Sequence, residues 1–186
     1  MLSERLKFYT KSNHQSLEGI VMDRINAICT KQDYVLLLKT FYRFVGSFEK
    51  AVRDHLDYSL LEDYSRRTKI DYIISDLTWL GKSLHSFSET TFITKIQSSP
   101  DALGALYVLE GSTLGGKIIS KIIREKLNFS NNSGLLYFNC YNDQTMDMWR
   151  KFKEFLDIQV FTAAQENVII RSANHTFLKF AELFNP

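Results

Sequence analysis

Histidine is the side chain in this sequence best suited to bind a transition metal, and it occurs at four scattered positions. The sequence has no Glu-x-x-His pair, no His-x-x-x-His pair and no Cys/His cluster, which disfavours a di-iron carboxylate bundle and a zinc site. It also lacks the GxSxG nucleophile motif and the complete GxxxxGK[ST] phosphate loop. A scattered histidine is most often structural or simply exposed. The four are His14, His55, His85 and His175.

His14 differs from the other three because of its neighbours. Lys7 and Lys11 precede it by seven and three residues. On a helix, which turns about 100° per residue, these spacings place both ammonium groups within about 60° of the imidazole. Two nearby cations favour the neutral imidazole, which is the form that binds a metal. The lysines could meet carboxylates of the same ligand, although an ordinary solvated edge of a helix would show the same pattern.

Four of the eight glycines fall within residues 104–116, inside what otherwise reads as one long helix. Gly104, Gly111 and Gly115 project within about 40° of one another on such a helix. Each interior glycine costs roughly 0.5–1 kcal/mol relative to alanine, so a compensating gain is expected. Close approach of another body to the bare backbone would supply it, with a bend available at Gly115-Gly116. That body is either a neighbouring helix or a large flat ligand.

The rest of the sequence predicts an all-α protein, because helical periodicity recurs while strand-like alternation is scarce. Only two prolines occur, Pro100 and Pro186, so little interrupts helix formation. The length and the absence of linkers or repeats indicate a single domain over residues 1–186. We expect helices over about residues 3–26, 33–56, 70–80, 98–127, 144–157 and 161–183.

Residues 57–69 are polar and charged and read as a connection between two of these helices. Arg66 and Arg67 are adjacent there and could serve an anionic ligand. A plainer role is to pair with Asp63 or Asp71 and so hold the connection in place.

Composition limits the classes of partner and compartment. The net charge of +2 is too small to indicate nucleic acid, and no apolar run approaches the 18 residues of a membrane span. The N-terminus lacks the apolar segment of a signal peptide. Cys29 and Cys140 are solitary, which is typical of reduced thiols. We expect a cytoplasmic protein without nucleic-acid or membrane partners, and a monomer by default.

Several motifs, in order along nearly the whole chain, resemble those of bacterial haem oxygenases. Residues 10–18, TKSNHQSLE, are similar to the proximal-histidine segment of that family, A-T-x-x-x-H-x-x-L-E. Residues 103–116, LGALYVLEGSTLGG, are similar to its distal helix. Residues 63–81 resemble its middle segment, and residues 137–152 resemble its F-F-x-x-Y-G…W-x-x-F block, with Asn142 at a position where glycine is common.

The resemblance implies a fold and a reaction. The fold would be an all-α, single-domain haem-oxygenase-like helical bundle with a glycine-kinked distal helix. Haem b would be both cofactor and substrate, together with O2 and an external reductant. The ring would be opened at one meso carbon, giving biliverdin, Fe2+ and CO. The electrons would come from a donor such as a ferredoxin or a flavin reductase.

The resemblance also implies roles for individual residues. His14 would be the axial ligand of the haem iron, leaving the sixth position open for O2. Gly111, Gly115 and Gly116 would cross the opposite face of the porphyrin. Without side chains, that helix could approach closely enough to direct bound oxygen towards one meso carbon, and the space would admit water.

The carboxylates of haem would need cationic partners at its edge. Lys7 and Lys11 suit this role by their helical spacing. Arg150 suits it because it follows Trp149 in the segment that resembles another propionate-contacting element of the family. Such charge-assisted contacts are worth roughly 1.5–3 kcal/mol when partly desolvated and less when exposed. They would also set the in-plane rotation of haem.

Ser112 stands where many haem oxygenases carry an aspartate that organises the proton-delivering water. A group of bacterial members has a glycine-serine pair there, so the serine is compatible with catalysis. The hydroxyls of Ser112, Thr113 or Tyr107, together with water, could deliver the protons.

Two alternatives remain open. A non-catalytic haem-binding protein for storage, transfer or sensing would keep His14 and the glycine strip but lack productive proton delivery. Ser112, in place of the usual aspartate, keeps this alternative open. A thiamin-degrading relative on the same scaffold would depend on a cysteine nucleophile. Cys29 and Cys140 lack the local sequence of that group.

Overall fold

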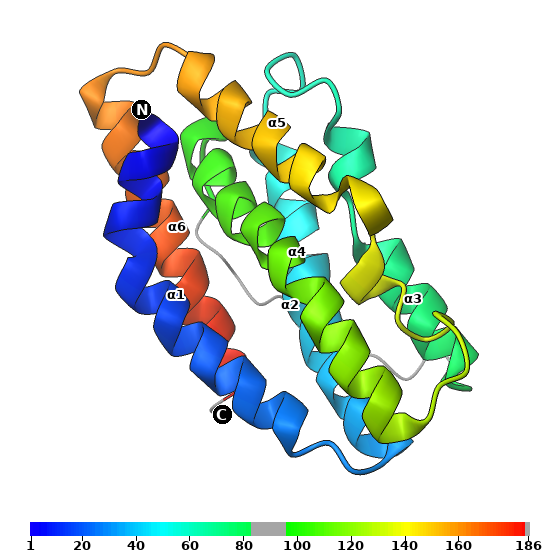
Figure 1. Cartoon of the computed structure of the whole chain (residues 1–186). Coiled ribbons are helices and arrows are strands. Elements are labelled where there is room, and N and C mark those ends of the chain that lie inside the picture. The colour runs from blue at the N-terminus through cyan, green and yellow to red at the C-terminus, as the bar shows by residue number, and fades with distance from the viewer. Residues whose placement is uncertain (83–95, 185–186) are drawn as a thin grey trace.

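The regular elements of the chain are all helical in the computed structural model, which describes residues 1–82 and 96–184 (Figure 1). His85 lies outside the described residues. The long helices are α1 (Leu2–Asn26), α2 (Lys31–His55), α3 (Ile70–Trp79), α4 (Ser99–Leu127), α5 (Thr145–Ile158) and α6 (Ala163–Phe184). Short 3-10 turns are η1 (Tyr64–Arg67), η3 (Tyr137–Asn139) and η4 (Asn142–Gln144). The expectation of an all-α fold is confirmed, and the helix limits expected from the sequence lie within about two residues of those observed.

Local capping explains where the two helices that frame the core begin. Thr30 and Asp33 form a reciprocal capping box at the start of α2, in which each side chain accepts from the other residue's backbone N–H. At the start of α4 the Ser98 hydroxyl accepts from the Asp101 N–H, and proline occupies the first turn. α4 ends at Asn128, whose positive φ of 52° is a left-handed cap.

α1 lies against α6, and α4 crosses the molecule beside this pair (Figure 1). α1 and α4 both run from the upper to the lower end in that view, so the two helices are roughly parallel. Polar contacts tie α1 to its neighbours: Arg5 pairs with Glu166 of α6, and the Asn13 amide donates to Asn174 Oδ1 at 2.6 Å. The N-terminal end of α1 is held by α5, because Ser3 donates to Asp157 at 2.6 Å.

Aromatic side chains form much of the core between α2 and α6. The rings of Phe44 and Phe180 stack with centroids 3.9 Å apart and planes 4° apart. Phe41 meets Phe180 edge-on at 5.2 Å. Offset and edge-to-face pairs of this kind bury large apolar surfaces and fix the helices relative to each other. Across residues 1–82 and 96–184, no helix has the length and apolar character needed to cross a membrane.

Candidate functional site

On the side of α1 that carries His14, four residues are buried, while His14 and the neighbouring Lys7 and Lys11 are exposed. Leu6, Thr10, Leu17 and Val21 follow the same stripe of the helix, and each is at most 8% exposed. His14, in the middle of the stripe, is exposed. An exposed imidazole within a buried stripe is accessible to a ligand, while the rest of the stripe holds α1 on the protein.

The glycines of the strip on α4 differ in what a side chain at each position would contact. A Cβ on Gly104 would lie 2.1 Å from the Ile169 carbonyl oxygen, so this glycine allows tight packing of α4 on α6. A Cβ on Gly111 would touch only the Trp149 ring, at an ordinary 3.6 Å. A Cβ on Gly115 would meet nothing within 4 Å. Helix packing therefore accounts for the first glycine of the strip, and open space adjoins the last.

Two apolar side chains of α4 are exposed on the same side as the open glycines. Leu114 is 38% exposed and Ile118 is 63% exposed. By helical geometry both lie within about 60° of the Gly111 direction. Exposed aliphatic side chains beside bare backbone form a surface suited to an apolar ligand.

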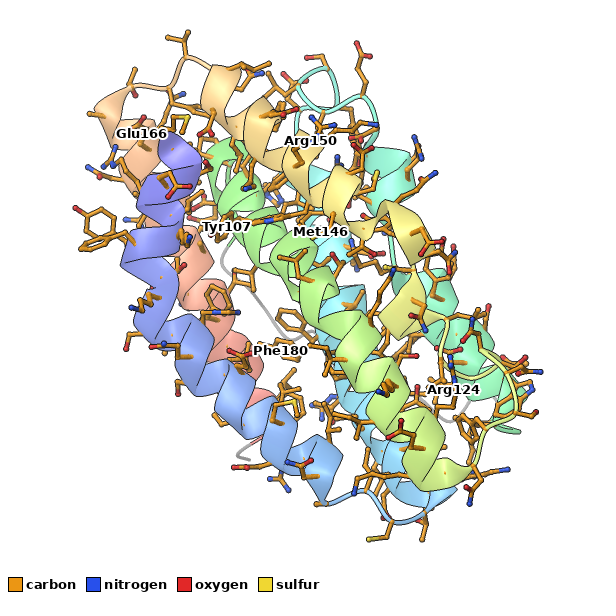
Figure 2. All side chains as sticks on the ribbon, in the orientation of Figure 1. Tyr107, Arg124, Met146, Arg150, Glu166 and Phe180 are labelled. Atoms are coloured by element: carbon orange, nitrogen blue, oxygen red, sulfur yellow. The ribbon has the colours of Figure 1, made fainter. Side chains whose placement is uncertain are left out.

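A contact between Tyr107 and Thr10 aligns the two faces. The Tyr107 hydroxyl is hydrogen-bonded with Thr10, and burial raises the pKa of Tyr107 to about 12. In Figure 2, Tyr107 lies between α1 and α4. His14 is one helical turn after Thr10, and Gly111 is one turn after Tyr107. Because the helices run in the same direction, His14 and the Gly111–Gly115 face follow this contact at the same level of the molecule.

The immediate surroundings of His14 are aromatic on one side and cationic on the other. Its ring lies edge-on to Phe177 of α6, with centroids 5.6 Å apart. Lys7 and Lys11 are exposed, and neither forms an ion pair with a described residue. These two cations are therefore available to an anionic group near His14.

Arg150 has carboxylate partners on its own helix. Its guanidinium pairs with Asp147 at 2.6 Å and with Glu154 at 2.7 Å, and its side chain is exposed. It borders a hollow of about 420 Å³ that Met146 and Trp149 also line, and Figure 2 places Arg150 and Met146 along α5. Because Trp149 also contacts Gly111, Arg150 lies near the rim of the open face of α4, and a ligand carboxylate there would compete with its present partners.

The hydroxyl groups expected to move protons are bonded to the helix. Ser112 Oγ donates to the Leu109 carbonyl at 2.7 Å, and Thr113 Oγ1 donates to the Glu110 carbonyl at 2.7 Å. Each oxygen still has lone pairs that can accept from water. By helical geometry Ser112 lies about 60° from the Gly115 direction, whereas Thr113 lies about 160° from it, so the geometry favours Ser112.

Gly116 packs in another direction from Gly115. Its Cβ position lies 2.1 Å from the Phe138 carbonyl oxygen of η3, so only glycine permits this approach. Asp76 holds that turn by accepting from the backbone N–H groups of Leu136 and Tyr137, at 2.8 and 2.9 Å. Gly116 thus has a packing role that its sequence position did not reveal, and a ligand could meet only its main chain.

A buried ion cluster lies directly behind Gly111, and the sequence analysis missed it. Glu110 is fully buried and accepts from Arg67, from Lys69 Nζ at 2.5 Å and from the Tyr141 hydroxyl at 2.9 Å. The expected pairing of Arg67 with Asp63 is confirmed, at 2.7 Å. Residues 57–69 form the expected connection between helices, and two of its charged residues, Arg67 and Lys69, are buried, each 1% exposed.

One signal in the sequence pointed to this cluster. Residues 102–109 are an uninterrupted run of apolar residues and glycine that is buried throughout, and Glu110 ends the run. A carboxylate at the end of a buried run requires buried donors or cations. The neighbouring Arg66, by contrast, is exposed and donates to Gln144 at 3.2 Å.

The two faces together suit a flat apolar ligand with acidic groups at its edge. One side offers an accessible imidazole, and the other offers backbone and aliphatic side chains. Unpaired lysines stand on the same helix as the imidazole. Haem has this combination of a metal, a planar ring and two carboxylates, so the residues present fit it.

Comparisons with known proteins agree with this fit. A family model described as haem oxygenase matches residues 1–186. The chain is 26% identical over 150 residues to a haem oxygenase of Xanthomonas campestris pv. campestris, covering 79% of this chain and 86% of that protein. It is 24% identical over 181 residues to haem oxygenase PigA of Pseudomonas aeruginosa, covering 97% and 90%.

A solved structure shows the same fold. The NO- and CO-bound haem oxygenase from Neisseria meningitidis superposes with a TM-score of 0.83 at 24% identity, covering 100% of this chain and 92% of that one. The match of the family model to the whole chain establishes the relationship: this protein belongs to the haem oxygenase family.

Proposed function

We propose that this haem oxygenase holds haem between His14 of α1 and the Gly111–Gly115 face of α4, and opens it to biliverdin. The observation that carries the proposal is the exposure of His14, together with Lys7 and Lys11, at the edge of the buried stripe that holds α1 on the protein. The open Cβ direction of Gly115 on the facing helix supports it. When bound, haem supplies the iron and the ring at which O2 reacts, releasing Fe2+ and CO.

His14 binds the metal through a neutral ring nitrogen in this proposal. The edge-on contact with Phe177 restrains the imidazole plane. His14 would hold the iron, and haem bound there would supply a metal that can also take a small ligand. Gly111 and Gly115 face the opposite side of the ring and leave room for O2 and water, while Leu114 and Ile118 exclude bulk solvent.

Protons reach the distal side through water in this scheme. The oxygen of Ser112 accepts from water while its own proton stays on the Leu109 carbonyl. This arrangement holds a water molecule at a fixed height over the ring without a carboxylate. Ser112 therefore replaces the role that an aspartate would have at that position.

Cations at the edge fix the rotation of haem in its plane. Lys7 and Lys11 bind one or both propionates, and Arg150 joins them if it leaves Asp147 or Glu154. Rotation determines which meso carbon faces the oxygen. We further propose that the reaction takes its electrons from an external protein donor, a ferredoxin or a flavin reductase, in a cytoplasmic monomer.

Aerobic turnover of the purified haem complex tests the function. Ascorbate or a ferredoxin system supplies electrons, absorbance follows the Soret band, and chromatography identifies the pigment. We expect the Soret band to disappear as biliverdin forms and CO is released. A Soret band that stays unchanged while O2 and reductant are present would indicate a haem storage or transfer protein instead.

A further inference from the structure

Two contacts on other sides of α4 bracket its open face. Glu110 immediately precedes Gly111, and Gly116 immediately follows Gly115. Gly116 is held by close packing against the Phe138 carbonyl. Glu110 is held by the buried ion cluster, which we define as Arg67, Lys69, Glu110 and Tyr141. The segment between the two contacts has few side chains with which to fix its own position.

The carboxylate of Glu110 in the ion cluster has a hydrogen-bond donor for each of its oxygens. Glu110 receives donors from Arg67, Lys69 and Tyr141, so both of its oxygens are satisfied. Lys69 Nζ also donates to the Arg67 carbonyl at 2.7 Å, which closes the cluster on itself. The Arg67 guanidinium lies 5.4 Å from the Phe152 ring of α5. Glu110 therefore joins α4 to η1, to the residues after it and to α5.

Stability alone does not explain such a cluster. Replacing a buried ion pair with apolar side chains of similar volume is often neutral or stabilising, because burial costs both ions their hydration. Hydrogen bonds from several donors are directional, and apolar packing is not. They therefore fix how one helix is rotated about its axis and how far it lies from its neighbours. Here they act at the residue next to the first open glycine.

We propose that Glu110 is a positioning residue that sets the height of the Gly111–Gly115 segment over the bound porphyrin. It acts through Arg67, Lys69 and Tyr141, without contact with haem. This inference rests on the proposed haem site, because the distance between the segment and the ring matters only if haem binds there. Its consequence is that loosening the cluster weakens the selection of the meso carbon that the in-plane rotation of haem presents.

Amide hydrogen exchange of the full chain without haem tests the mechanical part. The variants are Glu110→Gln, which keeps the shape and removes the charge, and Tyr141→Phe, which removes one donor. Tyr34→Phe is the matched control, since it deletes another buried hydrogen bond, at 2.7 Å from the Gly134 carbonyl. We expect Glu110→Gln to speed exchange at residues 111–116 by about tenfold more than the control does.

The same variants, loaded with haem, test the consequence. We expect Glu110→Gln to keep the Soret band of a histidine-ligated haem while the ratio of biliverdin isomers changes by about twofold or more. The proposal would be overturned if Glu110→Gln accelerated exchange uniformly along α4. It would also be overturned if this variant turned over haem normally and gave an unaltered isomer ratio. If Glu110→Gln does not fold, Tyr141→Phe decides by the same two readouts.

The two proposals fail in different ways. If the unmodified chain binds no haem, the proposed function fails, and the exchange experiment still reports whether Glu110 fixes the segment. If the unmodified chain turns over haem but Glu110→Gln matches Tyr34→Phe in both readouts, only the positioning role is lost.

Discussion

Gly115 and Gly116 are neighbours in the sequence but face different surroundings. A Cβ added to the first would meet nothing within 4 Å, and a Cβ added to the second would lie 2.1 Å from the Phe138 carbonyl oxygen. A sequence pattern treats both as one strip of small residues. The structure separates a glycine that fits ligand binding from one that serves packing, and substitution by alanine distinguishes them.

We predict opposite effects of alanine at these two positions. Gly115→Ala should raise the free energy of unfolding of the haem-free protein by about 0.5–1 kcal/mol, because alanine restricts the unfolded chain and favours helix. Gly116→Ala should lower it by about 1–3 kcal/mol, because the methyl group displaces η3. Urea unfolding measures both.

The gain at Gly115 should be accompanied by weaker haem binding. The added methyl group would project from the face proposed to lie over the ring, so a haem titration of Gly115→Ala should give a higher Kd than the unmodified chain. Equal affinity in the two proteins would place the porphyrin elsewhere.

Individual residues were predictable to the extent that their chemistry depends on local spacing. His14, Lys7 and Lys11 share one side of α1 because helical geometry alone puts them there. Glu110 and Lys69 are 41 residues apart, so their contact depends on how η1 and α4 pack, which no local pattern encodes. For the same reason the sequence left open whether Gly104 serves packing or a ligand and did not reveal the packing of Gly116, since their partners come from α6 and η3.

At the scale of helices, α1 and α4 meet one helical turn before His14 and Gly111. Thr10 and Tyr107 make the joining contact, and both are buried. One turn later, α1 presents an exposed imidazole. The helix limits were predictable from caps, proline and periodicity. The placement of α1 beside α4 was not, because it depends on how each of them packs against α6.

The lysine edge of α1 gives a prediction about charge. Replacing both Lys7 and Lys11 with alanine should weaken haem binding by about 1–2 kcal/mol, roughly a factor of 5 to 30, since exposed ion pairs contribute little each. The loss should shrink at high salt. Absorbance titration at two salt concentrations measures it, with the exposed Lys50→Ala on α2 as the control. An equal loss in the control would remove the assigned role.

At the scale of the whole molecule, buried carboxylates make stability depend on pH. Burial raises the pKa of Asp76 to about 6 from an ordinary 3.8, although two backbone N–H groups oppose the rise. Burial also raises the pKa of Glu49 to about 6 from 4.5. In both cases the folded protein binds a proton more tightly than the unfolded chain. Their contribution to stability is therefore complete below pH 4 and is lost as the pH rises through about 6.

Asp76→Asn isolates one of these groups. A change of about two pKa units corresponds to about 3 kcal/mol, so the difference in unfolding free energy between pH 4 and pH 7.5 should shift by up to that amount in the variant. Asparagine does not titrate, and the variant should lose less stability than the unmodified chain as the pH rises. Urea unfolding at several pH values gives both curves, and parallel curves would show that Asp76 does not titrate in this range.

The central claim is that the imidazole of His14 binds the iron of haem, and titration of haem into the chain tests it most directly. The comparison uses His14→Ala and His55→Ala, because His55 is another exposed histidine, whose ring Nδ1 lies 2.9 Å from the Ala51 carbonyl oxygen of its own helix. We predict that His14→Ala loses the Soret spectrum of a histidine-ligated haem and regains it when free imidazole is added, while His55→Ala behaves like the unmodified chain. An unaltered spectrum and affinity in His14→Ala would contradict the account.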